Sequence, residues 1–441
     1  MNIRHTTAAI AFIMAVLLST EFSGVWARNM MDAQRDSVCT SRKLAIIGQH
    51  GEPTASSDSV RHLIDMFYYD QFRHFQDPEA PYFLFMSKDA TLAMGMGGAV
   101  RMRAYVDWHG SVQSPGFAPY LIPMRPDPAK MRKFGTTPAG SSLFFRVIGR
   151  NKTVGSYQIY IEANFNGYQA RDFHLKKAYA AINDFTIGYT VSTFSDPMAL
   201  PPTVDAQGPV NKISGSTVLI RYTKKFCKGW SAAVSAENTP SQADISEGGT
   251  KVVDNWIPDG AAFLQYEWGP TTHIRLAGIV RSLSYRDLTD GTNHHKAGWG
   301  VMLSGIAHPA PQVTTFASIN YGHGYSSLGG DLQIGNYDMV PVPGQKGRLY
   351  APASMGWCAG VQYNFRPNLF ASTSVSRTHY LPAHTPDGAE YKYGMVAAIN
   401  TFWNLTPRIQ IGAEIDWGMR RNFDGDHNHA WRAGAMAQFS F

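Results

Sequence analysis

The sequence predicts an all-β fold, a transmembrane antiparallel β-barrel of about 16 strands, on three observations. From about residue 90 onward the chain divides into segments of strand length in which apolar and polar residues alternate. Short turns and long loops follow these segments in alternation. The chain ends on an aromatic residue, Phe441. Short turns at one end and long loops at the other are typical of barrels in the bacterial outer membrane, where periplasmic turns oppose extracellular loops.

The expected strands cover most of the chain after residue 90. They are 90–108, 141–151, 156–168, 172–183, 185–195, 214–224, 229–238, 260–269, 271–286, 295–306, 311–323, 353–365, 368–380, 389–404, 407–421 and 428–441. The expected long loops, rich in Pro, Gly and Asp, are 109–140, 196–213, 239–259 and 324–352. An even number of strands puts both ends of the chain on the side of the short turns.

Residue parity indicates which solvent each face meets. In 407–421 the apolar residues Ile409, Ile411 and Ile415 share one parity, and Glu414 and Asp416 share the other. Successive side chains of a strand point to opposite faces, so each segment has an apolar face and a wet face. Aromatic residues gather at segment ends, as in the interfacial girdles of membrane barrels. Lipid is therefore the expected partner of the apolar face.

The first part of the chain has a different character. Arg4, the apolar run 8–18 and the small residues at Val25 and Ala27 predict a signal peptide over 1–27. Residues 28–80 are expected to form a periplasmic extension with a helix from Ser59 to about Phe75. This helix either forms a stalk, plug or oligomer contact or packs against the barrel base. The barrel then spans 81–441, and the expected location is the bacterial outer membrane.

Motifs for other functions are missing from the sequence. The three cysteines, Cys39, Cys227 and Cys358, are far apart, which excludes a small disulfide framework and metal-ligand spacing. There is no nucleophile elbow, His-Glu-x-x-His motif or phosphate-binding glycine loop. The basic residues lack the clustering of a nucleic-acid patch. We therefore expect no enzyme, no metal, no cofactor and no nucleic-acid partner.

The wet face is predicted to be basic. By parity its cations are Arg101, Arg103, Arg146, Arg150, Lys176, Arg221, Arg275, Arg281, Lys392, Arg420 and Arg432, and its anions are Asp107, Glu162, Glu237, Glu267, Glu414 and Asp416. This face has an excess of about five positive charges if the strand registers are as predicted. The whole chain has a formal charge of +6. Such a lumen favours anions. The alternative is a mixed lumen in which the cations pair with these carboxylates and hold the strands in place.

Six of these arginines are the predicted pore-lining residues. Arg101 and Arg103 lie two apart on one face in mid-strand and are the best candidates for a constriction, followed by Arg146, Arg221, Arg275 and Arg281. The proline-rich loop from Asp196 to Pro209 carries Asp196 and Asp205, which are expected to face these arginines as a constriction loop. It either folds into the barrel or latches over a neighbouring subunit.

Three segments give the chain a family resemblance: 196–209 (DPMALPPTVDAQGP), 83–89 (FLFMSKD) and 167–172 (GYQARD). With these segments the sequence resembles the DcaP-like trimeric outer-membrane porins. The resemblance implies a barrel of sixteen strands, a homotrimer, a periplasmic extension and a basic lumen that passes small anions such as dicarboxylates. Family roles carry over to Arg101, Arg103 and the loop from Asp196 to Asp205. A terminal Phe441 also implies recognition by the barrel-assembly machinery.

The leading functional hypothesis is a passive porin for small polar, preferably anionic solutes. A substrate-specific channel would instead show saturable transport. A barrel enzyme would need a Ser or Asp with a His near the rim, and the sequence offers no such pair. A structural surface protein would show no conductance.

Overall fold

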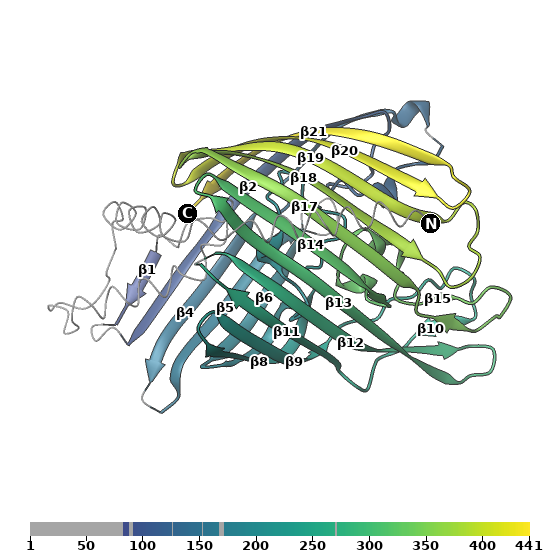
Figure 1. The fold of residues 1–441 in the computed structure, drawn as a ribbon, viewed down its shortest axis with the longest axis horizontal. Helices are drawn as coiled ribbons and strands as arrows, with labels where there is room; N and C mark the ends of the chain where they lie inside the picture. Colours follow the sequence, from purple (N-terminus) through teal and green to yellow (C-terminus); the bar gives the residue numbers. More distant parts are fainter. Residues whose placement is uncertain (1–82, 88–90, 126, 152, 167–171, 270) are drawn as a thin grey trace.

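The computed structural model describes residues 83–87, 91–125, 127–151, 153–166, 172–269 and 271–441. The predicted signal peptide 1–27 and extension 28–80 lie outside the described residues, and both remain predictions. Figure 1 shows one closed barrel whose strands run obliquely between an end with tight turns and an end with long loops.

Sixteen strands form the barrel wall, as predicted. They are β2 (Leu92–Trp108), β4 (Ser142–Asn151), β5 (Gly155–Asn166), β6 (Asp172–Ile182), β7 (Phe185–Val191), β8 (Ser216–Cys227), β9 (Trp230–Asn238), β11 (Asp259–Glu267), β12 (His273–Asp287), β13 (Asn293–Ala310), β14 (Val313–His323), β17 (Ala353–Arg366), β18 (Leu369–Leu381), β19 (Tyr391–Thr406), β20 (Ile409–Asn422) and β21 (His427–Ser440).

Shorter elements accompany the wall. They are the strands β1 (Phe83–Met86), β3 (Arg132–Thr137), β10 (Thr250–Val252), β15 (Val340–Pro341) and β16 (Leu349–Tyr350), and the 3-10 turns Pro119–Leu121, Pro128–Lys130, Pro197–Ala199, Ser326–Leu328 and Asp331–Gly335. No helix in the described part of the chain is long and apolar enough to cross a bilayer.

The barrel closes between its first and last wall strands. β2 pairs antiparallel with β21 from Ala99–Ser440 to Trp108–Trp431. The main chain of Phe441 continues this ladder, because its N–H and carbonyl bond to Gly98 at 3.0 and 2.9 Å. The chain therefore ends at the closing seam, which satisfies backbone groups that lipid cannot.

The other side of β2 has two partners. Its first half pairs with β4 and its second half with β3. β3 lies within 109–140, which the sequence predicts to be loop. This expectation is wrong for 132–137, where the chain already forms a ladder with β2 before Pro138 and Gly140 interrupt it.

One strand is shorter than expected. The predicted strand 185–195 ends at Val191, because the chain turns inward there. The hydroxyl of Ser192 donates to Glu237 at 2.6 Å, and the N–H of Thr193 donates to the same carboxylate at 2.8 Å. These bonds replace the next rungs of the β7 ladder.

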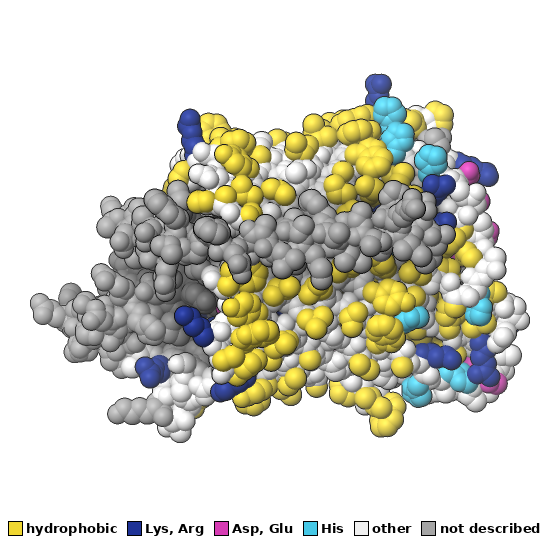
Figure 2. All heavy atoms as spheres, viewed as in Figure 1, with side chains coloured by type: hydrophobic (Ala, Val, Ile, Leu, Met, Phe, Trp, Pro, Cys, Tyr) yellow, Lys and Arg dark blue, Asp and Glu magenta, His cyan; other side chains and the backbone are white. Residues whose placement is uncertain are grey.

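The two faces of the wall differ as the parity predicts. The exposed large apolar residues of the wall, such as Val100, Ile220 and Ile399, point outward. Figure 2 shows that they cover the barrel's side, whereas charged residues and histidines gather at its ends. Inward positions are polar and buried, among them Arg146, Gln362 and Asn400. A closed barrel with an apolar exterior belongs in the outer membrane.

Candidate functional site: the loop inside the barrel

Residues 192–215, called the inner loop here, connect β7 to β8 and fold into the barrel. Its first anchor is Asp196, which is buried between β12 and β13. Its carboxylate accepts from Ser304 at 2.6 Å and lies 2.8 Å from His273 Nε2 and 3.9 Å from Arg275. Burial raises the pKa of Asp196, but Arg275, His273 and Ser304 outweigh it and hold that pKa below its usual range.

The second anchor ties the middle of the inner loop to β20. Both N–H groups of Val204 and Asp205 donate to the carboxylate of Glu414, at 2.7 and 2.6 Å. Just before them, the carbonyl of Pro202 accepts from Ser372 on β18 at 3.1 Å and from Asn400 on β19 at 2.8 Å. The loop backbone therefore bonds directly to side chains of the opposite wall.

The third anchor is an ion-pair network around Arg432 on β21. The guanidinium binds Asp107 of β2 through two hydrogen bonds of 2.7 and 3.0 Å. It also donates to Asp205 of the inner loop at 3.0 Å. Asp205 accepts in addition from the N–H of Phe117, at 2.9 Å. This network holds the inner loop, the first extracellular loop and the barrel seam together.

The last part of the inner loop forms hydrogen bonds with β14 and β18. The N–H of Val210 donates to Ser376 at 3.0 Å. The side chain of Asn211 donates to Ser318 at 3.0 Å, and its carbonyl accepts from Asn320 at 2.9 Å. These anchors reach from β12 to β21, so the loop lines that half of the interior.

The inner faces of β4, β5 and β6, which the inner loop does not cover, carry further cations. Arg146 donates to Gln158 at 2.7 Å. Lys176 and Lys177 lie 2.6 and 3.6 Å from the buried carboxylate of Glu162. The Lys176 side chain is 46% exposed, although its ammonium is paired with Glu162.

The six predicted arginines all point inward, but they have different surroundings. Arg101 is half-buried and donates to Gln438 at 2.6 Å. Arg103 is buried and donates to the carbonyls of Val204 and Ala139, so it holds the inner loop. Arg146 is also buried.

The other three arginines lie on β8 and β12. Arg221 is half-buried and donates to the Val191 carbonyl at 3.5 Å. Arg275 donates to Gln265 and to the carbonyl of Ser195, at 2.6 and 2.8 Å. Arg281 is enclosed, with ion pairs of 3.0 Å to Asp259 and 2.9 Å to Asp338. Arg281 thus meets the alternative expectation of a cation that holds strands and loops together.

The structure adds one candidate that the sequence reasoning missed. Lys212 is the only basic residue in 192–215, and its ammonium donates to the carbonyl of Gln207 at 3.0 Å. Burial lowers the pKa of Lys212; the nearby Asp205 opposes this, whereas Lys176 and Arg103 add to it. Lys212 therefore lies within electrostatic range of Asp205 in its own loop, of Arg103 on β2 and of Lys176 on β6. The sequence feature that could have identified Lys212 is that it is the single lysine of a proline-rich loop.

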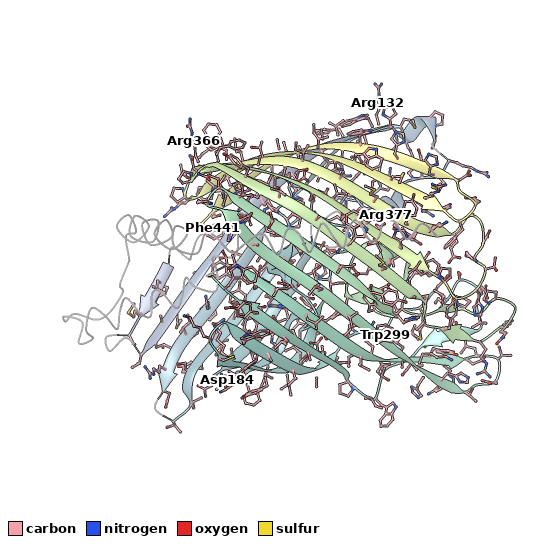
Figure 3. The ribbon with its side chains drawn as sticks, viewed as in Figure 1. Arg132, Asp184, Trp299, Arg366, Arg377 and Phe441 are labelled. Carbon is pink, nitrogen blue, oxygen red and sulfur yellow. The ribbon has the colours of Figure 1, made fainter. Side chains whose placement is uncertain are left out.

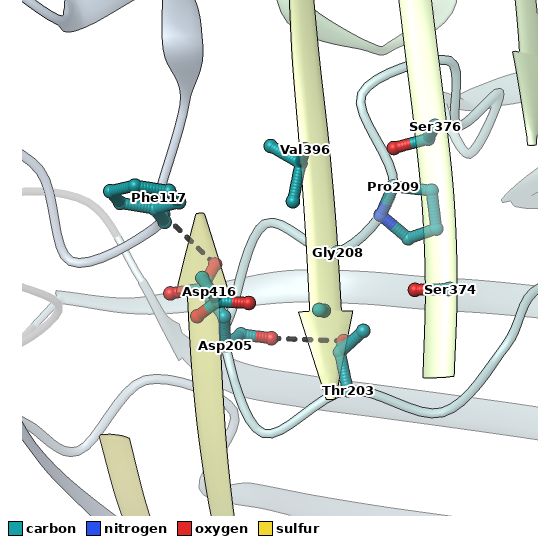
Figure 4. A pocket seen from close by; sticks show the side chains of 10 residues that line it. Phe117, Thr203, Asp205, Gly208, Pro209, Ser374, Ser376, Val396 and Asp416 are labelled. Atoms are coloured by element: carbon teal, nitrogen blue, oxygen red, sulfur yellow. Dashed lines mark hydrogen bonds between the residues drawn. The ribbon is translucent and has the colours of Figure 1, made fainter. Parts of the chain in front are cut away.

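A small cavity lies beside the inner loop. Figure 4 shows Asp205, Thr203, Ser374, Ser376 and Asp416 around it. Asp416 is buried, and its Oδ2 accepts no hydrogen bond among the described residues. Its charged neighbours are three carboxylates and the Arg432 guanidinium. This end of the inner loop is thus locally rich in carboxyl groups.

One group of described residues at the turn between β12 and β13, of which Asp287 is buried and Asp290 is exposed, has donor atoms that could hold a metal ion. Ligand atoms of Asp287, Asp290 and His294 lie within 4.8 Å of one another. Asp287 and Asp290 each accept a hydrogen bond from a residue two positions on, as in ordinary turns. Nothing further in their surroundings points to a metal.

The fold has clear relatives among solved structures. The outer-membrane channel DcaP of Acinetobacter baumannii aligns with a TM-score of 0.68 at 20% identity, covering 81% of this chain and 99% of that one. An anion-selective porin from Comamonas acidovorans aligns with a TM-score of 0.55 at 9% identity, over 79% and 100% of the two chains. No family model and no curated protein matches the chain. The chain has the fold of outer-membrane porins, and its resemblance to the DcaP-like porins is confirmed for that fold.

Proposed function

We propose that the protein is a passive outer-membrane channel for small polar solutes, with a preference for anions such as dicarboxylates. The observation that carries the proposal is the inner loop. It is bonded to one half of the wall and carries Lys212, on which the charges of Asp205, Lys176 and Arg103 act. A solute would pass between this loop and the inner faces of β4 to β6.

The charge of this passage supports the anion preference. Arg281 and Arg432 are buried in ion pairs, so they do not act on a solute directly. Lys176, Lys212 and Arg101 are at least partly exposed. Positive charge at a narrow, low-dielectric opening lowers the free energy of anion entry. Arg101, Arg146 and Arg221 supply further cations along the wall, and Asp196 and Asp205 fix the loop.

The test is a planar-bilayer measurement of the purified protein in a KCl gradient. We expect stepwise conductance and a reversal potential shifted toward the equilibrium potential of chloride. Replacing Lys176 and Lys212 by Gln together should move that potential toward zero. The matched control replaces Lys228 and Lys251, which are exposed at the two rims, and should leave it unchanged. Cation selectivity would reject the anion preference, and absent conductance would reject the channel.

Two finer expectations can be measured on the same protein. Conductance of a dicarboxylate salt should rise linearly with concentration, whereas saturation would indicate a substrate-specific channel with a defined site. In detergent, the homotrimer implied by the family resemblance should have three times the mass of one chain.

A further inference from the structure

The outward face of β18 to β21, β2 and β3 carries a row of tryptophans and, beside it, a group of basic side chains. Trp417, Trp431 and Trp108 are cross-strand partners on β20, β21 and β2. The rings of Trp108 and Trp431 stack at 6.1 Å. Tryptophans of a membrane barrel lie at the boundary between hydrocarbon and headgroups. This row therefore marks the outer edge of the hydrocarbon layer.

Basic side chains follow directly beyond the tryptophans, toward the long loops. His379, Tyr393, Arg421 and His427 are cross-strand partners on β18, β19, β20 and β21. Arg421 lies four positions beyond Trp417 on the same face, about 13 Å along the strand. The outer basic patch, as we name it, consists of Arg377, His379, Arg421, His427 and His429 on outward positions beyond the tryptophan row, and of Arg132 on β3, which is the cross-strand partner of Trp108 and lies level with that row. In Figure 3, Arg132 and Arg377 lie nearer the loop end than Arg366, which marks the opposite end.

Among the residues that the structure describes, the patch has no negative partners. The Arg377 guanidinium stacks on the Tyr393 ring at 3.8 Å, and its Nε is buried without a hydrogen bond among the described residues. The charged neighbour that acts on Arg377 is another cation, Arg421. No described ion pair joins either arginine to a carboxylate.

The nearest carboxylates in sequence belong to the adjoining loops. They are Asp387 and Glu390 between β18 and β19, and Asp424 and Asp426 between β20 and β21. Asp387 and Asp424 accept hydrogen bonds from the N–H groups of Ala389 and Asp426 in their own loops. The outward strand positions of β18 to β21 carry no carboxylate.

Two neighbouring guanidiniums at headgroup depth, with no carboxylate partner among the described residues, are suited to binding an anion from outside the chain. Guanidinium binds phosphate through paired N–H groups, and such charge-assisted bonds are strong where water is scarce. The long loops face the outside of the cell, so the headgroups at this level are those of the outer leaflet. We propose that the outer basic patch binds the phosphate groups of a phosphorylated glycolipid of that leaflet.

The experiment measures lipid binding to the purified full-length protein in detergent. The probes are lipid A with two phosphates and the same lipid with its phosphates removed, and bound lipid is counted by native mass spectrometry. Wild type should bind the phosphorylated lipid at least about tenfold more tightly. Replacing Arg377 and Arg421 by Gln should abolish most of this difference. The control, Arg366→Gln with Lys228→Gln, removes the same charge at the end with the short turns and should retain it.

Several results would overturn the proposal. Equal binding of the two lipids by wild type would show that phosphate is not recognised. An unchanged preference in the Arg377/Arg421 variant would place the site elsewhere. Full competition by millimolar inorganic phosphate would identify a free-phosphate site. Loss of the oligomer in that variant, with lipid binding intact, would make this face a subunit contact. Barrel assembly of each variant is checked by its heat-dependent shift in gel mobility.

Discussion

Replacing Asp205 by Asn tests how the inner loop is held. Oδ1 of Asp205 accepts from the N–H groups of Phe117 and Gln207 at 2.9 and 2.8 Å, and an amide oxygen can still do so. Oδ2 accepts from Arg432 at 3.0 Å, where the amide would place a donor against a donor. Arg432 keeps both bonds to Asp107 and is not left unpaired. The loss is therefore about 1.5–3 kcal/mol, that of a hydrogen bond to a charged group, and not the 3–5 kcal/mol of a fully broken buried pair.

The assay has two readouts. The free energy of unfolding in urea should fall by that amount. In the bilayer, open-channel noise should increase because the middle of the loop is freed, and the reversal potential should become more anion-selective because one negative charge is lost beside the passage. Asp254→Asn is the control, since Asp254 is an exposed carboxylate of the extracellular loop 239–258. Unchanged stability and noise in Asp205→Asn would refute the assignment of Asp205 as an anchor.

Three further predictions concern buried charges. Asp416→Asn should raise the thermal midpoint, because Asp416 lies near three carboxylates and one guanidinium, that of Arg432, and its Oδ2 accepts no hydrogen bond from the described residues; a lower midpoint would contradict this. Arg281→Gln should cost about 3–5 kcal/mol by leaving Asp259 and Asp338 buried without their cation, while the reversal potential of any assembled channel stays the same; a large shift in that potential would make Arg281 a pore residue. Burial raises the pKa of Asp331 to about 6, above its unfolded value of about 3.9, so its contribution to stability should rise by up to about 3 kcal/mol as the pH falls from 7 to 4. Asp331→Asn should lose this dependence in pH-resolved thermal unfolding, and an identical pH profile in wild type and variant would contradict the assignment.

Strand positions could be predicted well from the sequence because alternation is a local signal. The segment 407–421 is the strand Ile409–Asn422, with Ile415 outward and Glu414 inward as its parity requires. β3 was missed because its ladder with β2 is short and Pro138 interrupts the chain directly after it.

The path of the inner loop could not be predicted because its bonds are non-local. Asp205 meets Glu414 and Arg432, which are 209 and 227 positions away in the chain. Parity did place the predicted arginines on the inward face. It could not separate Arg281, enclosed by Asp259 and Asp338, from Arg101, which stays partly exposed. That distinction depends on which loops fold over each side chain.

Thiol accessibility tests whether solutes pass between the inner loop and the wall of β4 to β6. Lys212→Cys is placed in a background with Cys39→Ser and Cys227→Ser, since Cys39 lies outside the described residues, Cys227 is exposed and Cys358 is buried. A negatively charged methanethiosulfonate reagent is then added during current recording. If solutes pass beside Lys212, the current should fall stepwise for Lys212→Cys. It should not fall for Asn211→Cys, because the Asn211 side chain faces Ser318 on β14. Unchanged current after confirmed modification of Lys212→Cys, or block through Asn211→Cys alone, would contradict the proposed path.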